Sequence, residues 1–573
     1  MESTEKKLLA EGISSLYKHR DDFIVFGLTG RTGSGCSTAA DQLVKSADKL
    51  VLGQPASPLK TNDERKYSIV WDWTKKHWHP FSRIRVSDLI ISKALSTPLD
   101  DLKRFLLGNN TSEAVVSSVV AIIESIDGLS DYSRFWQATN IEELEQEEIH
   151  RINDKFFNGF DALRKRFRDC FEIESNTSYT TIMQLAGDNL RRSGSVISNE
   201  CIPEQLFSLP SAINRLIKIF RKSNRNSGAK SYFVIDAIRH PFEAIFLRER
   251  YSSFYLIGVT TDELSRKKRL NARYNDEEIK LISEKEYPTD DLLKSYSFLV
   301  TQNIGACLQQ ADILINNKES ALENDFSELT ENLAKYVALA QHPGLVPPTP
   351  IERCMQIAMT AKLNSGCISR QVGAAISGND YSITAIGWNS VPQGQVPCSL
   401  RNIQRLKNGT DKDSFSSYEQ KEFRKEISKL HEWKCDEYSF NGRPLSYCFK
   451  SSYNKAKKPK TQVQPRSLHA EENAFLQIVK NGGIGIKNGF LFTTASPCEL
   501  CSKKAYQLGI KKIYYIEPYP GIANDHILDC GSEKPELILF TGAIGRAYIH
   551  LYHPLLSQKD ELEILLSASA SQI

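Results

Sequence analysis

The sequence predicts an α/β fold in two parts, and three observations support this prediction. Short β-branched and aromatic runs alternate with helical stretches up to about residue 340. A glycine-rich turn, FGLTGRTGSGCST, follows the first of these runs. Three prolines, Pro347, Pro348 and Pro350, interrupt the chain before a second series of strands and helices. A chain of 573 residues is also too long for one ordinary core, which favours several domains.

The composition indicates a soluble globular protein. Apolar residues make up 40% of the chain, charged residues make up 25%, and the formal net charge is only +4. This charge balance points to neither nucleic acid nor membrane. The N-terminus is charged without an apolar signal core, and no apolar run approaches the ~20 residues that span a bilayer. Twelve cysteines lie at irregular spacing apart from Cys498 and Cys501, so we expect a cytoplasmic chain without disulfides or membrane association.

Five predicted strands in the first part, residues 20–340, indicate a parallel, doubly wound sheet. They lie at residues 23–29, 82–88, 231–237, 253–260 and 312–317. The intervening residues 96–199 carry helical patterns such as SVVAIIESI, and we interpret them as a helical insertion. Residues 341–350 form the predicted linker to the second part.

The turn after the first strand has most of the pattern of a P-loop, G-x-x-x-x-G-K-[ST], in which backbone N–H groups cradle a phosphate. The expected nucleotide-binding residues are Gly30, Gly33, Gly35, Ser37 and Thr38. Cys36 stands where the pattern has the lysine that holds the β- and γ-phosphates. Phosphoryl transfer would need a replacement cation, for which Arg31 is the candidate. Nucleotide binding without turnover and a purely structural role both remain open.

The second part, residues 351–573, is predicted to be a three-layer α/β/α domain. A helix over residues 351–363 precedes a hairpin that VGAAIS and YSITAIGW form around the turn GND. A helix at SLHAEENAFLQIV, the strand GFLFTTA, a helix from Pro497 and the strand KKIYYIE continue the order.

Two short motifs in this second part predict a catalytic metal centre. His469-Ala470-Glu471 precedes Pro497-Cys498-Glu499-Leu500-Cys501. One imidazole and two thiolates supply three ligands for Zn²⁺ and leave a fourth position for water, which is the arrangement of a catalytic site and not of a closed structural one. With Ser496 as the N-cap, Cys498 would lie in the first helical turn, where the helix dipole favours its thiolate. Together the motifs match the H-x-E…P-C-x-x-C signature of zinc deaminases.

Glu471 is the predicted catalytic residue. If His469, Cys498 and Cys501 bind the metal, this carboxylate has no place as a ligand. We expect it to take a proton from the activated water and to deliver protons to the ring nitrogen and the departing ammonia.

Longer segments around these motifs resemble the deoxycytidylate deaminases of the cytidine deaminase superfamily. The segments are HAEENA, SPCELCSKKAYQLGIKKIYYIEPYP and SRQVGAAI…AIGWNSVPQG, and the resemblance covers about residues 351–555. It implies a cytidine-deaminase-like fold and a substrate contact for Asn389. The family has glycine where this chain has Ser390, whereas Pro392 and Gly394 match the family's pattern.

The first part resembles nucleoside-phosphate kinases. VIDAIRHPFEAIFLRERY has their strand-Asp-x-[IV]-R shape, SRKKRLNAR is similar to their basic lid, and ADILINN is similar to their last strand. A P-loop NTPase (nucleotide-kinase-like) domain ahead of such a deaminase resembles the bacterial anti-phage dCTP/dCMP deaminases. This resemblance implies conversion of free deoxycytidine nucleotides, dCTP and/or dCMP, to deoxyuridine nucleotides, which depletes dCTP. It also implies a possible effector such as dTTP, a possible inhibitory small RNA, and a homo-oligomer.

Other interpretations of the sequence remain open. The same motifs occur in RNA- and tRNA-editing deaminases, and the deaminase could be gated by a nucleotide- or RNA-sensing first part with low basal activity. Cys398, His431, Cys435 and Cys448 could hold a second, structural zinc. The sequence does not distinguish dCMP from dCTP as the substrate.

Overall fold

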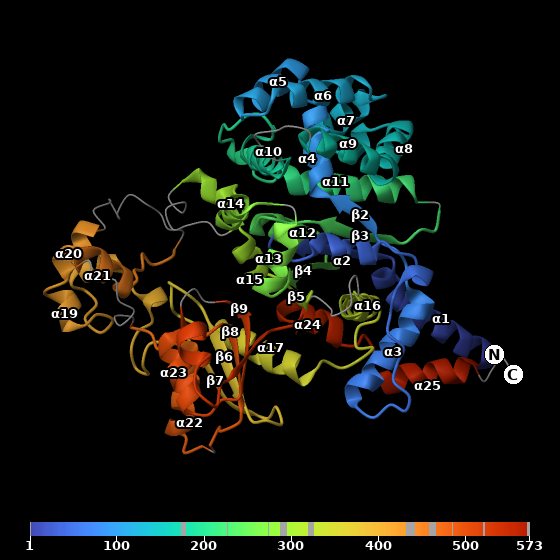
Figure 1. Ribbon diagram of the computed structural model, residues 1–573. Helices are drawn as coiled ribbons and strands as arrows, with labels where there is room; N and C mark the ends of the chain where they lie inside the picture. The colour runs from blue at the N-terminus through green and yellow to red at the C-terminus, as the bar shows by residue number, and fades with distance from the viewer. Residues whose placement is uncertain are drawn as a thin grey trace. The chain divides into compact units, whose positions relative to one another are not determined.

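The structure is a computed structural model, and it describes residues 2–172, 179–225, 227–272, 274–286, 295–318, 326–430, 442–457, 466–483, 485–518 and 522–569. The chain divides into two compact units, which are drawn together in Figure 1. Unit 1 comprises Met1–Pro347 with Arg546–Ile573, and unit 2 comprises Pro348–Gly545. The division between Pro347 and Pro348 falls inside residues 341–350, the predicted linker.

The last residues group with unit 1, which differs from the prediction of one domain over residues 351–573. The red helix α25 (Gln558–Ser569) packs beside the blue helix α1 (Glu2–Asp21) in Figure 1. Glu561 accepts a hydrogen bond from the Tyr17 hydroxyl at 3.0 Å and pairs with His342 Nε2 at 2.9 Å. Because Tyr17 and Glu561 are 544 positions apart, no local sequence pattern could predict this pairing.

Unit 1 contains the predicted parallel sheet. Its strands are β1 (Phe23–Thr29), β2 (Ser82–Arg85), β3 (Ser231–Asp236), β4 (Phe254–Thr260) and β5 (Ile313–Asn316). They lie side by side in the order β5-β4-β1-β3-β2, and every one of these pairings is parallel. The second strand is shorter than predicted because a helix begins at Val86. The α/β character of this part is confirmed.

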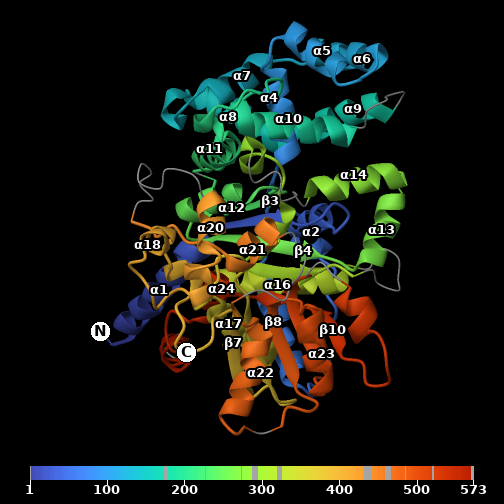
Figure 2. The same ribbon diagram turned by 90° about the vertical axis from the view of Figure 1, so that its left-hand side faces the viewer.

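Eight α-helices are described between β2 and β3 in the chain, from Val86 to Ser223, which is a longer stretch than the predicted insertion at residues 96–199. This helical region contains α4 (Val86–Leu95), α5 (Leu99–Gly108), α6 (Glu113–Glu124), α7 (Leu129–Gln137), α8 (Gln146–Asp154), α9 (Phe160–Glu172), α10 (Tyr179–Ser193) and α11 (Ser208–Ser223). Figure 2 shows these helices gathered together, away from most of the strands of unit 1. Buried side chains of the region, such as Phe135 and Phe160, belong to one continuous core with Val25 and Phe233 of the sheet. The insertion is therefore part of the same hydrophobic core and not an independent domain.

The other helices of unit 1 connect or cover the strands. They are α2 (Cys36–Leu43), α3 (Asn62–His77), α12 (Pro241–Arg250), α13 (Glu263–Asn271), α14 (Asp276–Glu286), α15 (Ile304–Gln309) and α16 (Ser327–Gln341). Helix α24 (Gly545–Tyr552) begins at the last residue of unit 2.

Unit 2 is built on a second sheet, with strand order β10-β9-β8-β6-β7. Its strands are β6 (Gly373–Ser377), β7 (Ile383–Trp388), β8 (Phe490–Ala495), β9 (Lys512–Glu517) and β10 (Glu536–Leu539). The two-residue strand β11 (Gly542–Ala543) is not part of this sheet. The hairpin of β6 and β7 is antiparallel, β6 is antiparallel to β8, and β8, β9 and β10 are parallel. The hairpin predicted around GND is confirmed.

Two glycines bring helices against opposite faces of this sheet. A Cβ atom on Gly373 would lie 2.0 Å from the carbonyl oxygen of Ala358, in α17 (Pro350–Lys362). A Cβ atom on Gly387 would lie 2.2 Å from the carbonyl oxygen of Ala470, in α22 (Ala470–Lys480). Gly373 pairs with Trp388, and Ala374 pairs with Gly387, so the two glycines face opposite sides of the sheet. Unit 2 therefore has the predicted three layers, and α22 lies close to the strands.

A smaller core lies beside the main one in unit 2. It is surrounded by helices α18 (Ile403–Asn408), α19 (Ser417–Gln420), α20 (Arg424–Leu430) and α21 (Phe449–Lys457). Helix α23 (Glu499–Gln507) belongs instead to the main layers. The small core is centred on Phe423, Ile427 and Tyr447. Within the described ranges, no helix has the length and apolarity needed to cross a membrane.

Candidate active site

His469 lies at the point where an extended segment becomes helix α22. The preceding residue, Leu468, donates its N–H to the carbonyl of Ser390 at 2.8 Å and so ties the segment to the residues after β7. His469 has extended backbone angles, φ −71° and ψ 157°, and is the N-cap of α22. Its own N–H faces the Glu472 carboxylate at 3.4 Å. The imidazole is therefore held at the start of the helix, where the sequence predicted it.

Cys498 is the N-cap of α23, which corrects the prediction that Ser496 is the cap. The Ser496 N–H donates at 2.8 Å to the carbonyl of Glu517, the last residue of β9, so the backbone at Ser496 stays bonded to the neighbouring strand although β8 ends at Ala495. The first helical hydrogen bond runs from the Ser502 N–H to the Cys498 carbonyl at 2.8 Å. Cys501 follows within the first turn, and the two thiols face the same side.

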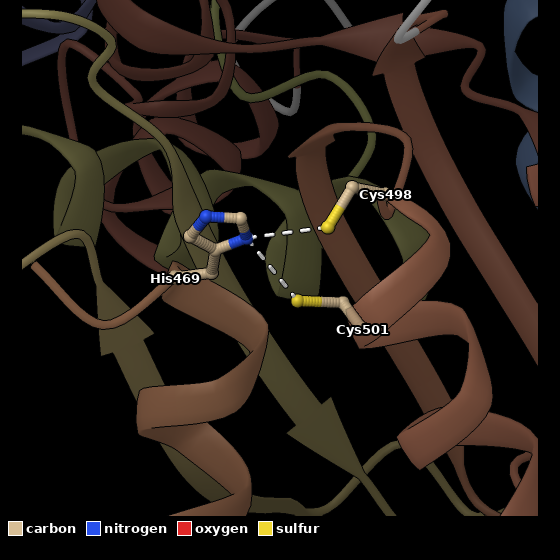
Figure 3. Close-up of side chains that lie close together, drawn as sticks. All are labelled: His469, Cys498 and Cys501. Carbon is tan, nitrogen blue, oxygen red and sulfur yellow. Dashed lines mark hydrogen bonds between the residues drawn. The ribbon is translucent and has the colours of Figure 1, made fainter. Parts of the chain in front are cut away.

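The imidazole and both thiols converge in Figure 3. His469 Nδ1 lies 3.3 Å from Cys498 Sγ and 3.5 Å from Cys501 Sγ, and all three donor atoms lie within 4.8 Å of one another. Hydrogen bonds from Cys501 and His469 lower the pKa of the Cys498 thiol to about 3. One nitrogen and two sulfur donors in so compact a group fit the ligand set that proteins offer to Zn²⁺. Among the described residues, this is the group that could hold a metal ion.

Glu471 lies one position inside α22, next to these donors. Its side chain is 4% exposed, and burial raises the pKa of its carboxyl group above the ordinary value. The Thr493 hydroxyl, from β8, lies 3.3 Å from Glu471 Oε1. A raised pKa makes a carboxylate a stronger base, which suits this group to accept and return protons.

A cavity of about 270 Å³ opens onto this group. His469, Glu471 and Cys498 contribute to its wall. So do three basic residues, Arg370, Lys450 and Arg466. The Arg370 guanidinium pairs with Glu517 at 3.1 Å. Arg466 donates to the carbonyl of Ser414 and to Gln395 Oε1, each at 3.2 Å.

Asn389 lines the same cavity from the end of β7. The Val372 N–H donates to Asn389 Oδ1 at 3.1 Å, and the Asn389 carbonyl accepts from the Ser365 hydroxyl at 2.9 Å. Because the amide oxygen is bound to the backbone, the NH₂ group is the end of the amide that remains for a ligand. The structure therefore brings Asn389 together with the residues of the predicted metal centre.

The sequence alone indicates no role for the three basic residues that line the cavity. Arg370 lies in the SRQVGAAI segment, while Lys450 and Arg466 are the two ends of the polar, basic stretch KSSYNKAKKPKTQVQPR, which begins within α21. Residues 458–465 of that stretch are outside the described residues. Their positive charge is the signal that the sequence offers, but charge does not show which basic side chains line a cavity.

The residues suggested for a second zinc are only partly described. Cys398 and Cys448 line the cavity, whereas His431 and Cys435 lie outside the described residues. That second centre stays a prediction.

The residues of the predicted P-loop belong to unit 1. Gly33 and Gly35 have positive φ angles of 88° and 104°, which glycine adopts easily. Gly35 is the N-cap of α2, and Thr38 lies in the first turn of that helix. The Ser37 hydroxyl donates to Asp236 at 3.1 Å, and the Gly30 carbonyl accepts from Arg239 at 3.1 Å.

The arrangement in unit 2 defines a class of enzyme. A histidine and two cysteines converge at helix starts beside a buried glutamate, which is the site of the zinc-dependent deaminases. The family model described as "Cytidine and deoxycytidylate deaminase zinc-binding region" matches residues 348–517. The deoxycytidylate deaminase of Enterobacteria phage T2 is 30% identical over 169 residues, which cover 29% of this chain and 78% of that protein. The chain belongs to the deoxycytidylate deaminase family.

Two further deoxycytidylate deaminases and one solved structure are also similar to this chain. The deoxycytidylate deaminase of Enterobacteria phage T4 is 29% identical over 29% of this chain and 76% of its own. That of Schizosaccharomyces pombe is 28% identical over 36% of this chain and 48% of its own. A crystal structure of the dCMP deaminase from the cyanophage S-TIM5, in complex with dCMP and dUMP, matches 33% of this chain and 95% of that chain at 24% identity and a TM-score of 0.20. The prediction of an enzyme of the deoxycytidine nucleotide deaminase class is confirmed by the family membership.

Proposed function

We propose that this chain removes the amino group of free deoxycytidine nucleotides, dCMP and/or dCTP, by hydrolysis. The products are deoxyuridine nucleotides and ammonia. One observation carries the proposal: His469, Cys498, Cys501 and the buried Glu471 converge on a cavity that Asn389 and three cations also line.

Proton transfer is the task of Glu471. When bound by His469, Cys498 and Cys501, zinc supplies the Lewis acidity that makes water a nucleophile at neutral pH. The Glu471 carboxylate accepts a proton from that water and delivers protons to the cytosine ring nitrogen and to the departing amino group. Burial, which raises its pKa, suits the carboxyl group to both acceptance and donation.

Substrate binding is assigned to the other side chains of the cavity. The Asn389 NH₂ group donates to a polar atom of the nucleoside, with its orientation held by the Val372 N–H. Arg370, Lys450 and Arg466 attract the negatively charged phosphates. Three cations are compatible with a monophosphate and with a triphosphate, so both dCMP and dCTP belong to the proposal.

The wider role is proposed from the order of the two parts. A kinase-like P-loop part ahead of a deaminase resembles the bacterial anti-phage enzymes, which supports dCTP depletion as the biological outcome. Control by an effector such as dTTP, inhibition by a small RNA, and assembly into a homo-oligomer remain predictions of the same resemblance.

The decisive experiment compares the purified chain with a Glu471→Ala variant. Each protein is analysed for zinc and offered dCMP, dCTP, cytidine and a cytosine-containing RNA, with ammonia release as the readout. We expect zinc in both proteins and turnover of the deoxynucleotides by the parent, reduced by about 10²–10⁴-fold in the variant because its proton carrier is gone. Glu533→Ala, at an exposed position of unit 2, is the matched control and should retain full activity.

Other outcomes would change the proposal. Turnover of the RNA alone would make the chain an editing deaminase. Equal turnover by the parent and by Glu471→Ala would remove Glu471 from the mechanism. Zinc in both proteins without any turnover would point to a gated enzyme that needs an effector.

A further inference from the structure

An ion pair joins the two helices that carry the predicted metal ligands. Lys504 Nζ of α23 pairs with Glu472 Oε1 of α22. Lys504 lies three positions after Cys501, and Glu472 lies three positions after His469. Because residues three apart are neighbours on a helix, each partner of the ion pair lies about one turn from a predicted ligand. The ion pair therefore connects the two helices beside the metal centre.

Glu472 also faces the backbone of His469. As the third residue of α22, it is at the position from which a carboxylate can accept a hydrogen bond from the N–H of the N-cap. The His469 backbone nitrogen lies 3.4 Å from Glu472 Oε2, while Oε1 is the oxygen that pairs with Lys504. One carboxylate thus connects the start of α22 to α23. The position of the imidazole relative to Cys501 depends on where this carboxylate is held.

The ion pair is placed to act on the metal ligands and not on the substrate. Among the described residues that form the cavity wall, neither Glu472 nor Lys504 is present. Their side chains are 27% and 43% exposed, and a partly exposed ion pair contributes little to overall stability. Contacts that orient metal ligands have a larger effect on metal affinity, because the donor atoms must meet the ion together. Here His469 Nδ1 and Cys501 Sγ, which come from different helices, lie 3.5 Å apart.

We propose that Glu472 and Lys504 are positioning residues, which hold α22 and α23 at the separation that lets His469 and Cys501 bind one zinc ion. This inference rests on the proposed zinc-dependent function of the site. Lys504 acts through Glu472, because the lysine restrains the carboxylate and the carboxylate restrains the His469 N–H. Neither side chain contacts the substrate or exchanges protons with it.

The test measures the zinc affinity of the full chain by competition with a chromophoric chelator. In Lys504→Met the side chain keeps its length but loses its charge, so we expect zinc to bind about fivefold more weakly. Lys504→Arg keeps the charge and should restore the affinity of the parent. Lys503→Met is the matched control, because Lys503 is exposed on the same helix, and its affinity should equal that of the parent. Unfolding curves verify that each variant is folded.

Glu472→Gln separates positioning from a direct effect of charge. This variant keeps Lys504, whose positive charge would by itself favour the thiolates, but removes the anion that the lysine holds. We expect the same loss of zinc affinity as in Lys504→Met, and no further loss in the double variant, because one interaction can be broken only once. Proteins loaded with Co²⁺ provide a second readout, since the visible absorption of Co²⁺ reports the geometry of its ligands. This absorption should change in both single variants and not in Lys503→Met.

Three results would overturn the proposal. Zinc affinity in Lys504→Met equal to that of the parent would remove the lysine from the metal centre. Affinity in Glu472→Gln that equals or exceeds that of the parent would assign the effect of Lys504 to its charge alone. Losses that add up in the double variant would mean that the two residues act independently. Failure of the proposed function has a different result, because the parent would then bind zinc but deaminate no nucleotide, and the zinc affinities would still test the ion pair.

Discussion

At the residue scale, the active site depends on contacts that hold each group in one orientation. The Val372 N–H binds Asn389 Oδ1, the Thr493 hydroxyl approaches Glu471, and the Leu468 N–H secures the segment before His469. None of these partners reacts itself. They determine which atom of each side chain faces the cavity. By holding the reacting groups in one geometry, they contribute to catalysis.

Thr493→Val tests one of these contacts. Valine has nearly the same shape but no hydroxyl, so the Ala495 carbonyl loses its donor at 2.7 Å and Glu471 Oε1 loses its polar neighbour at 3.3 Å. We expect kcat to fall by up to about tenfold, with zinc content unchanged, since a hydrogen bond is worth about 0.5–1.5 kcal/mol. Steady-state kinetics provide the measurement. Thr360→Val, at an exposed position of α17, is the control, and equal kcat values for the two variants would contradict the prediction.

His240 makes the stability of unit 1 sensitive to acid. It is 2% exposed at the start of α12, and burial lowers its pKa to about 4. Because the unfolded chain binds this proton more readily than the folded chain, stability is complete above pH 6.5 and is lost as the pH falls towards 4. Between pH 7 and 5 the contribution of His240 should decrease by about 2 kcal/mol.

Urea unfolding at both pH values provides the measurement for His240. His240→Asn keeps a side-chain acceptor for the Phe242 N–H, which His240 Nδ1 accepts at 3.3 Å, but it cannot be protonated. The variant should therefore lose less stability between pH 7 and 5 than the parent. An identical loss in both proteins would assign the acid sensitivity to other groups.

At the element scale, hydrogen bonds between elements decide where the catalytic helices begin. The Ser496 N–H remains bound to the end of β9, so α23 starts later than the local sequence predicts and Cys498 becomes its N-cap. Gly387 lets α22 approach β7 closely, and that helix carries both His469 and Glu471. The distance between the helices and the sheet therefore controls the geometry of the site.

Gly387→Ala should disturb this approach. The added Cβ would lie 2.2 Å from the Ala470 carbonyl and 2.5 Å from the Ala474 nitrogen, so α22 must move away from the sheet. We expect a loss of about 1–3 kcal/mol in stability from overpacking, together with reduced zinc content and activity. Gly485→Ala is the control, because its Cβ would meet nothing within 4 Å. Retention of full activity and stability by Gly387→Ala would contradict this account of α22.

At the scale of the whole molecule, helix α25 belongs to unit 1, although the sequence predicts that it belongs to the second domain. Glu561 of α25 contacts Tyr17 of α1 and His342, and the Tyr17 and His342 rings stack with centroids 4.2 Å apart. The hydrogen bond to Glu561 and burial together raise the pKa of the Tyr17 hydroxyl to about 12. The two ends of the chain thus contribute to one folding unit.

Glu561→Gln tests this connection. The variant loses the charge that pairs with His342, and we expect the stability of unit 1 to fall by about 1–2 kcal/mol. Glu563→Gln, on the same helix with a side chain 66% exposed, should have no measurable effect. Urea unfolding followed by tryptophan fluorescence is the measurement, since Trp73 lies close to His342. Equal midpoints for the two variants would mean that the Glu561 contacts do not stabilise the unit.

Many of the strands and the metal centre could be predicted because short, local sequence patterns indicate them. The strands of both units follow from runs of β-branched and aromatic residues, and the metal centre was predicted from two short motifs, one with His469 and one with Cys498 and Cys501. Features that depend on distant partners could not be predicted. Thr32 donates a hydrogen bond to Glu286, which is 254 positions away, and the start of α23 depends on a hydrogen bond to Glu517.

The position of α25 has a consequence for synthesis of the protein. A ribosome makes all of unit 2 before it makes the helix that packs on α1. Until then, α1 and the residues around Tyr17 lack this partner, although residues 1–347 of unit 1 have already been synthesised. Domains generally fold in the order in which they are made, but here the first unit is completed last.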